Sequence, residues 1–181
     1  LALLTPIVKA FVTDNGHIAT NACMQVFGGH GFIRDNGMEQ FVRDNRINMI
    51  YEGTNTIQSL DLLGRKVLGN QGATLKKFGK LIGALVAEEG VNEKMAEFIT
   101  PIAILGDQMT KFTTEIGFKG FQNPDEVGAA AVDYLRVAGH LAFAYLWARM
   151  AKIALAKRDG GDGVRRGPFA GSPVDGHRPA P

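Results

Sequence analysis

The sequence has 181 residues, of which 45% are hydrophobic, and its 20 Lys+Arg and 18 Asp+Glu give a formal net charge of +2 at pH 7. This composition can build a core, which excludes wholesale disorder, and the near-neutral charge argues against a nucleic-acid binder. The single cysteine, Cys23, excludes an internal disulfide framework and a cysteine-cluster metal site. No apolar run approaches the roughly 18–20 residues that cross a bilayer, so we expect no membrane span.

Alternating strand signals are almost absent, so the sequence predicts an all-α fold. The first helical segment is expected over about residues 6–26, with Thr5 as its N-cap and Pro6 at its first position. Residues 14–16, Asp-Asn-Gly, could divide this segment into two helices. The glycine cluster at residues 28–31 is expected to end it.

A short helix is expected over about residues 38–49. Another follows Glu52 and Gly53, with Thr54 as its N-cap and apolar residues at helical spacing as far as Val67. Residues 69–72, Gly-Asn-Gln-Gly, are typical of a linker, and we place a domain boundary there. The first domain is therefore expected to be a helical bundle over residues 1–68.

Two apolar stripes follow the linker. One ends at Gly90, and the other runs from Met95 to Ile116 in the steps of three and four typical of helices packed on helices. Pro101 either begins a fresh helix capped by Thr100 or kinks a longer one. A last helix is expected over about residues 124–157.

The last helix is capped by Asn123 in this interpretation and is apolar on most sides over residues 137–148. Such a helix lies between neighbours in a bundle or packs against a partner chain. These helices make residues 69–157 a second, helical extension. Residues 158–181 contain six Gly and four Pro with almost no apolar repeat, which predicts a disordered tail.

The clearest local signal for chemistry is Glu52, which stands between two predicted helices beside Tyr51 and before Gly53. Burial against an apolar or aromatic wall raises a carboxyl pKa, and a carboxylate then exchanges protons near neutral pH. Taken alone, a Glu before a helix is more often a cap or a partner of the helix dipole. The local sequence leaves both interpretations open.

Four further features bear on possible chemistry. The adjacent Gly28 and Gly29 could expose backbone N–H groups to an anion or cofactor, although a helix C-cap followed by a turn is the commoner meaning. Residues 43–46, Arg-Asp-Asn-Arg, are typical of structural ion pairing or a solvated face. The four histidines show no metal-ligand spacing, so no metal site is expected. Cys23 is expected to be a packed thiol on an apolar helix.

Residues 25–31 (Gln-Val-Phe-Gly-Gly-His-Gly), 43–47 (Arg-Asp-Asn-Arg-Ile) and 50–58 (Ile-Tyr-Glu-Gly-Thr-Asn-Thr-Ile-Gln) together resemble the C-terminal helical domain of flavin-dependent acyl-CoA dehydrogenases in order and spacing. The resemblance covers roughly residues 1–68. Residues 69–156 resemble the helical extension of a longer bacterial branch that includes methylthiopropionyl-CoA dehydrogenases.

The resemblance implies an FAD-dependent oxidation of an acyl-CoA to the trans-2-enoyl-CoA, with Glu52 as the base that removes the α-proton. Gly53 would lie against the thioester end of the substrate. The residues implied to contact FAD are Thr54, Asn55 and Thr56 after the base, and Gln25, Val26, Phe27, Gly28 and Gly29, the last five usually toward the FAD of a neighbouring subunit. Some relatives carry Gln where this sequence has Thr56.

The resemblance also implies a homo-oligomer, either a dimer or a tetramer, that passes electrons to electron-transfer flavoprotein or another acceptor in a bacterial cytoplasm. The family's N-terminal helical domain and β-domain do not lie in this sequence, so we expect the fragment alone to be inactive. The competing interpretation is a non-catalytic helical module for oligomerisation or interaction, in which Glu52 has no role in activity. A membrane-surface helix over residues 137–157 is a third, although a solvated helix end explains its basic residues equally well.

Overall fold

The computed structural model describes residues 2–159, and every regular element within that range is helical, which confirms the predicted all-α fold. The α-helices are α1 (Leu4–Val26), α2 (Gly29–Phe32), α3 (Met38–Arg46), α4 (Asn55–Leu60), α5 (Ala73–Glu89), α6 (Ala96–Gln122) and α7 (Asp125–Asp159). A π-helical segment, Asp61–Val67, continues α4. The predicted disordered tail lies outside the described residues from 160 onward. Its first two residues are helical, so α7 extends two residues past its expected end.

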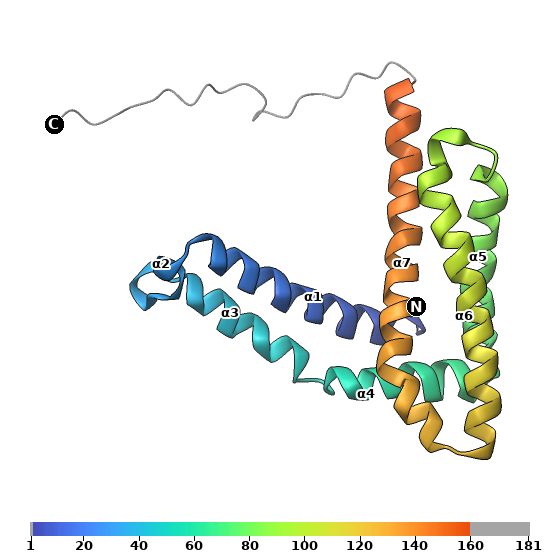
Figure 1. Ribbon diagram of the computed structural model, residues 1–181, viewed down its shortest axis with the longest axis horizontal. Helices are drawn as coiled ribbons and strands as arrows, with labels where there is room; N and C mark the ends of the chain where they lie inside the picture. The colour runs from blue at the N-terminus through green and yellow to red at the C-terminus, as the bar shows by residue number, and fades with distance from the viewer. Residues whose placement is uncertain (1, 160–181) are drawn as a thin grey trace.

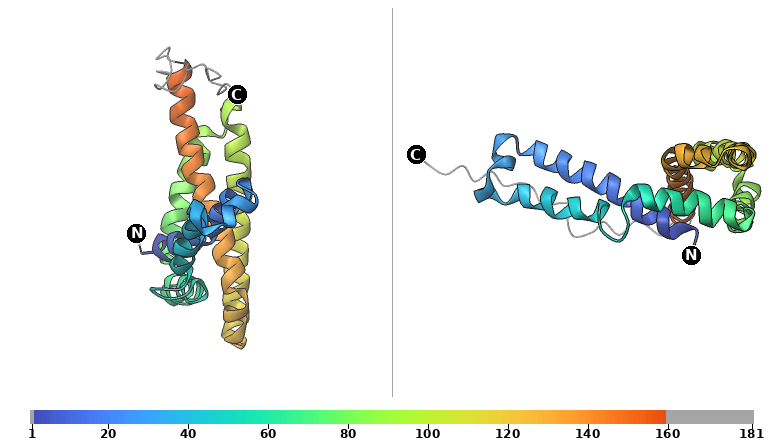
Figure 2. Two further views of the ribbon diagram at one scale, coloured as in Figure 1. Left: turned by 90° about the vertical axis from the view of Figure 1, so that its left-hand side faces the viewer. Right: turned by 90° about the horizontal axis from the view of Figure 1, so that it is seen from below.

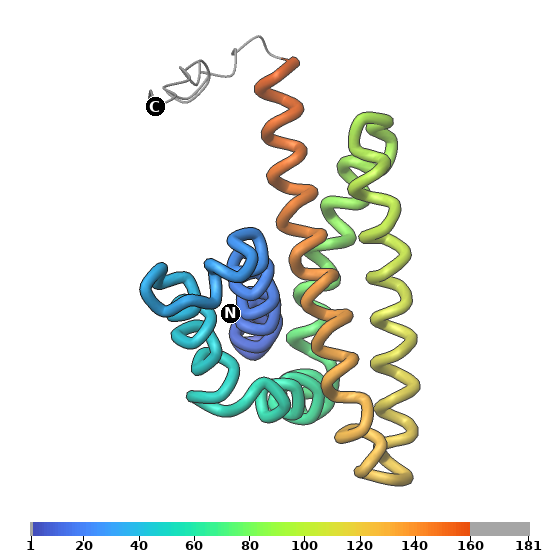
Figure 3. The backbone as a smooth tube through the Cα atoms, turned by 60° about the vertical axis from the view of Figure 1, so that its left-hand side comes forward, coloured from blue at the N-terminus to red at the C-terminus, as the bar shows by residue number. Residues whose placement is uncertain are grey.

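Two parts of the chain are visible in Figure 1. Helices α5, α6 and α7 run up, down and up beside one another as an elongated bundle. Helices α1, α2 and α3 form an arm that projects sideways from this bundle, and α4 with its π-helical continuation crosses the bundle near its lower end (Figures 1 and 2). Figure 3 shows α1 nearly end-on, where it meets α7.

Helix α1 is continuous, so residues 14–16 do not divide it. The side chain of Asn15 donates to the carbonyl oxygen of Phe11 at 2.7 Å, so this polar residue is satisfied without leaving the helix. The helix begins at Leu4, which places Thr5 inside the first turn and not at the predicted N-cap. Pro6 is tolerated there because the first four N–H groups of a helix have no intrahelical partner.

The first half of α1 is buried against α7, and the second half lies in the exposed arm. Phe11 marks the contact: its ring packs edge-on to His140 and tilted against Phe143, with centroids 4.9 and 5.1 Å apart. Gly139 makes this approach possible, because a Cβ at that position would lie 2.3 Å from the Phe11 ring. The predicted packing of Cys23 is wrong, because its half of α1 projects away from the core and the thiol is exposed.

The core of the bundle is formed by buried side chains of the π-helical segment and of α5, α6 and α7, with Ile82 and Leu85 from α5. Its fully or almost fully buried members include Leu62, Leu63, Val67, Met95, Ile102, Met109, Ala131, Tyr134 and Leu135. The predicted stripes of α5 and α6 therefore face inward as expected. The tip of the bundle is held by Lys152 of α7, which forms a salt bridge with the buried Glu89 at the end of α5 at 2.9 Å. Lys152 and the side chain of Asn92, which donates to Glu89, lower the pKa of that carboxyl.

Helix α6 passes through Pro101 without a break, so Thr100 does not begin a fresh helix. The side chain of Asn123 accepts the N–H of Asp125 at 3.2 Å, in agreement with its predicted role as the cap of α7.

No helix within residues 2–159 is long and apolar enough to cross a bilayer. The outer face of α7 carries Leu146, Trp147, Met150 and Ile153, all exposed, and is left unpaired by the rest of the described chain.

Candidate functional site

The candidate site is the turn at residues 50–54, which joins the end of α3 to α4. A single 3₁₀ turn, Ile47–Met49, follows α3, and the chain then reverses through Glu52 and Gly53 before α4 begins. Both residues have a positive φ, +54° at Glu52 and +85° at Gly53. A left-handed conformation costs a residue other than glycine about 1–2 kcal/mol. The turn therefore carries strain at the residue predicted to be the base.

Two side chains from outside the turn hold its carbonyl oxygens. Gln58 donates through Nε2 to the carbonyl oxygen of Glu52 at 2.9 Å, and Lys9 donates through Nζ to that of Gly53 at 2.7 Å. A hydrogen bond contributes about 0.5–1.5 kcal/mol net, and more when the donor is charged, although solvent weakens both in an exposed turn. The two bonds together are of the size needed to offset the strain at Glu52.

Asn55 connects the same turn to α1 through a polar cluster of Lys9, Thr13, Asp14 and Asn55. Its Oδ1 accepts from Lys9 Nζ at 2.8 Å, and its Nδ2 donates to Asp14 Oδ1 at 2.6 Å and to Thr13 Oγ1 at 3.0 Å. An ammonium on one side of the amide and a carboxylate on the other determine which way the amide faces. The first residue of α4 is therefore anchored on the buried half of α1.

The surroundings of Glu52 are open in this chain. The Glu52 side chain is exposed, and its apolar neighbours Ile50, Tyr51 and Ile57 are 47%, 48% and 54% exposed. These three side chains make up the apolar wall of the turn, and nothing within residues 2–159 covers them. Glu52 is therefore open to solvent in the described chain.

A cleft of about 310 Å³ lies beside the turn. It is lined by Thr54, Asn55 and Thr56 from the predicted cofactor stretch, by Arg46 and Ile50 from the preceding segment, and by Val132, Leu135 and Arg136 from α7. Arg46 and Arg136 bring positive charge to this cleft, and Asp14, which also lines it, brings negative charge. Val132 and Arg136 were missed by sequence reasoning because they lie about 80 positions later in the chain, and no local pattern connects them to the turn.

The second predicted stretch, residues 25–29, lies at the outer corner of the arm. Gly28 adopts φ +56° and ψ −143°, and its N–H bonds the carbonyl oxygen of Gln25 at 3.0 Å, which ends α1 as the C-cap interpretation predicted. Gly31 allows α2 to pack closely against the end of α1, since a Cβ there would lie 2.3 Å from the Met24 carbonyl oxygen. Val26 and Phe27 are exposed. Figure 1 shows this corner and the Glu52 turn at opposite ends of α3, so one chain does not bring them together.

The remaining candidates have structural or solvated settings. Arg43, Asp44 and Arg46 are exposed, and Asp44 accepts from Gln40 Nε2 at 2.6 Å, which agrees with the solvated-face interpretation. Residues 2–159 contain no group of three His, Cys, Asp or Glu side chains that could hold a metal ion.

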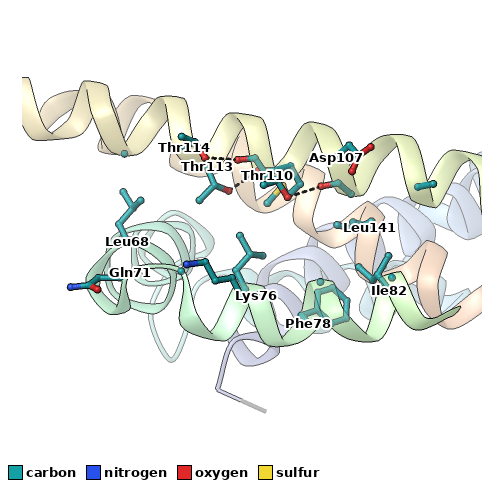
Figure 4. Close-up of a pocket in the computed structure, with 18 of the residues that line it drawn as sticks. Leu68, Gln71, Lys76, Phe78, Ile82, Asp107, Thr110, Thr113, Thr114 and Leu141 are labelled. Atoms are coloured by element: carbon teal, nitrogen blue, oxygen red, sulfur yellow. Dashed lines mark hydrogen bonds between the residues drawn. The ribbon is translucent and has the colours of Figure 1, made fainter. Parts of the chain in front are cut away.

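A larger groove of about 830 Å³ runs between α5 and α6 (Figure 4). Apolar side chains such as Phe78 and Ile82 line it together with the hydroxyl groups of Thr110 and Thr113, and Lys76 lies along it. No residue of the Glu52 turn or of residues 25–29 contributes to its wall. Sequence reasoning did not anticipate this groove, in which the glycines at positions 79, 83 and 106 have no side chains to fill the space between the two helices.

Two regions of the chain match known protein families. Residues 3–68 match the family described as "Acyl-CoA dehydrogenase, C-terminal domain", and residues 75–171 match the family described as "Acetyl-CoA dehydrogenase C-terminal like". The chain belongs to the acyl-CoA dehydrogenase family. Members of this family are FAD-dependent, act on acyl-CoA thioesters and are oligomeric.

Individual relatives agree with this membership. The chain is 36% identical to 3-methylmercaptopropionyl-CoA dehydrogenase of Ruegeria pomeroyi and 27% identical to the broad-specificity linear acyl-CoA dehydrogenase FadE5 of Mycobacterium tuberculosis, and each alignment covers 88% of this chain and 27% of the relative. It is 34% identical to a butyryl-CoA dehydrogenase of Syntrophomonas wolfei over 61% of this chain and 18% of that protein. The chain thus spans about a quarter or less of the length of these acyl-CoA dehydrogenases.

Proposed function

We propose that the chain is the C-terminal portion of an FAD-dependent acyl-CoA dehydrogenase in which Glu52 is the base that removes the α-proton of the acyl-CoA thioester. The observation that supports this most is the strained and doubly anchored turn, in which the exposed Glu52 directly follows the exposed apolar residues Ile50 and Tyr51. In this proposal residues 1–68 form the C-terminal domain of the enzyme, residues 69–157 form its helical extension, and the enzyme acts in a bacterial cytoplasm.

The chemistry divides between this chain and its cofactor. Glu52 accepts the α-proton, and the electron pair of that C–H bond forms the new double bond as the β-hydrogen departs as hydride. FAD, when bound, would supply the hydride acceptor, and the proposed electron-accepting partner of the enzyme is electron-transfer flavoprotein or another acceptor. A thioester α-proton is far too weak an acid for a solvated carboxylate, so the apolar wall must be covered before the transfer.

The turn suits this task. Gly53 has no side chain beyond its backbone, which lets the thioester end of the substrate approach closely. Ile50, Tyr51 and Ile57 would exclude water from Glu52 once acyl-CoA and the other domains of the enzyme cover them, and the loss of solvent raises a carboxyl pKa. In the complete enzyme, the substrate and the other domains would then pack against this apolar wall and complete the active site.

The cofactor contacts proposed for this chain fall into two groups. Thr54 and Thr56 line the cleft beside the turn, where Arg46 and Arg136 outnumber the single carboxylate of Asp14 and leave a net positive charge suited to an anionic cofactor. Asn55 also borders this cleft, but its amide is engaged with α1, so the main chain is the part of Asn55 left for FAD.

The second group, Gln25, Val26, Phe27, Gly28 and Gly29, lies at the other end of α3. This separation supports a contact with the FAD of a neighbouring subunit rather than with the FAD beside the same chain's Glu52. The proposal therefore requires a homo-oligomer, either a dimer or a tetramer.

The test is Glu52→Gln in the complete, FAD-loaded enzyme. This change keeps the size of the side chain and removes the proton acceptor. We expect acyl-CoA binding to stay nearly intact and flavin reduction to slow by about 10²–10⁴-fold, the usual contribution of a positioned base. The measurement is anaerobic stopped-flow bleaching of the flavin after mixing with acyl-CoA.

Glu97→Gln is the matched control, because Glu97 is an exposed glutamate near the start of α6, outside the turn. It should reduce its flavin at the wild-type rate. If Glu52→Gln also does so, Glu52 is not the base. The fragment alone should turn over no acyl-CoA, since Glu52 is uncovered in it.

The exposed apolar face of α7 favours a second candidate function, a helical module for assembly with no catalytic role for Glu52. The same experiment separates the two. For a module that only assembles, Glu52→Gln leaves activity unchanged, whereas Trp147→Glu on the α7 face disrupts the oligomer.

A further inference from the structure

We propose that Lys9 is a positioning residue for the Glu52 base: its ammonium ties the Gly53 carbonyl oxygen and the Asn55 side chain to α1 and thereby sets the direction of the Glu52 carboxylate. The proposal rests on the function proposed above, because it concerns how the base of that reaction is held. It adds a residue 43 positions earlier in the chain, outside the three sequence blocks that carry the family resemblance.

The turn needs an external support. Two consecutive residues, Glu52 and Gly53, are in the left-handed region, and an L-residue such as Glu52 leaves that region when the structure around it does not hold it there. If the backbone dihedrals of these two residues change, the direction of the Glu52 Cα–Cβ bond relative to α1 changes, and the carboxylate moves with it. The position of the Glu52 carboxylate therefore depends on the groups that bond the carbonyl oxygens of Glu52 and Gly53.

Lys9 is the support that comes from the rigid part of the molecule. Gln58, which holds the Glu52 carbonyl oxygen, belongs to α4 and moves with the turn, whereas Lys9 belongs to the buried half of α1. Ile7, Ala10 and Phe11 around it are buried in the core, and Phe11 is inserted against α7. The Lys9 ammonium thus connects the turn to the bundle.

The polar cluster fixes the ammonium in turn. Lys9 Nζ donates to two acceptors, the Gly53 carbonyl oxygen at 2.7 Å and Asn55 Oδ1 at 2.8 Å. Asn55 is held by Asp14 and Thr13 on the same face of α1, and Thr13 Oγ1 donates to the carbonyl oxygen of Lys9 at 2.7 Å. Each member restrains the next, so the position of the ammonium is determined by α1 and not by the flexible lysine stem.

The test is Lys9→Met in the complete, FAD-loaded enzyme, because methionine keeps an unbranched stem and removes the charge and the donors. We expect the limiting rate of flavin reduction to fall about 10- to 100-fold, as for a base displaced by about an ångström, while the Kd of acyl-CoA changes much less. Lys9→Arg keeps a cation with donors and should recover part of the rate. A wild-type reduction rate in Lys9→Met overturns the proposal.

Amide hydrogen exchange gives a readout that does not depend on turnover or on bound FAD. In Lys9→Met, amides of residues 51–56 should exchange at least about tenfold faster, and those of α6 should keep their wild-type protection. Unchanged exchange in the turn overturns the proposal even if Lys9→Met loses activity. Lys80→Met, which removes an exposed lysine on α5, is the matched control and should leave the rate and the exchange unchanged.

Failure of this inference is distinguishable from failure of the proposed function. If Glu52→Gln abolishes flavin reduction and Lys9→Met reduces its flavin normally, Glu52 is the base and Lys9 does not position it. If Glu52→Gln reduces its flavin normally, the proposed function fails whatever Lys9→Met does. Both variants are measured with the same preparation and the same acyl-CoA.

Discussion

The contact between Gly139 and Phe11 joins the arm that carries the candidate site to the bundle, and Gly139→Ala tests it. An alanine Cβ would lie 2.3, 2.5 and 2.9 Å from three atoms of the Phe11 ring. Carbon atoms in contact are about 3.5–4.0 Å apart, so the ring must move by roughly 1 Å or more. His140 and Phe143 already pack against that ring, so the movement disturbs them as well.

The expected magnitude follows from two opposing effects. Overpacking a core typically costs about 1–3 kcal/mol, whereas replacing glycine by alanine inside a helix contributes about 0.8–1.0 kcal/mol of stability. Gly139→Ala should therefore lower the free energy of unfolding by roughly 0–2 kcal/mol. Gly128→Ala in the same helix is the matched control, because a Cβ there meets nothing within 4 Å, and it should raise the free energy of unfolding by up to about 1 kcal/mol.

The assay is urea unfolding of the chain followed by circular dichroism, at two protein concentrations so that association is separated from folding. The decisive quantity is the difference between the two alanine variants, which we expect to be about 1–3 kcal/mol. Phe11→Leu in the Gly139→Ala background should recover part of the lost free energy of unfolding, because the smaller leucine side chain leaves room for the alanine Cβ. Equal stability of Gly139→Ala and Gly128→Ala would refute the close contact.

Two further predictions concern the bundle. The chain should associate in solution because the outer face of α7 is apolar, with Trp147 60% exposed. Trp147→Glu should shift the sedimentation coefficient toward that of the monomer. A wild-type chain that sediments as a monomer would count against this prediction. Burial raises the pKa of Tyr134 from its ordinary value of 10.0 to about 12, although a hydrogen bond with Thr113 acts in the opposite direction. The Tyr134 phenol of the unfolded chain ionises at lower pH than that of the folded chain, so the free energy of unfolding should fall as pH rises from 10 to 12. Urea titrations of Tyr134→Phe should show a smaller fall. An equal fall in the variant would show that another group is responsible.

Local pattern was enough to determine most of the helices. The apolar spacing in α5 and α6 predicted their inward faces, because a stripe at steps of three and four has one way to be buried. Asn123 predicted the start of α7 through its cap, and three short blocks, residues 25–31, 43–47 and 50–58, together carried the family resemblance before any geometry was known. These features depend on neighbours within about one or two helical turns, so the sequence alone can determine them.

Tertiary contacts decided what the pattern left open. Residues 14–16 remain helical because Asn15 bonds back to the helix, and Cys23 is exposed because only the first half of α1 meets the bundle. Lys9 bonds the carbonyl oxygen of Gly53, 44 positions away, and Phe11 fits only because a glycine stands at position 139. No local periodicity encodes such pairs, since their energy depends on the distance between segments that meet only after the chain has folded.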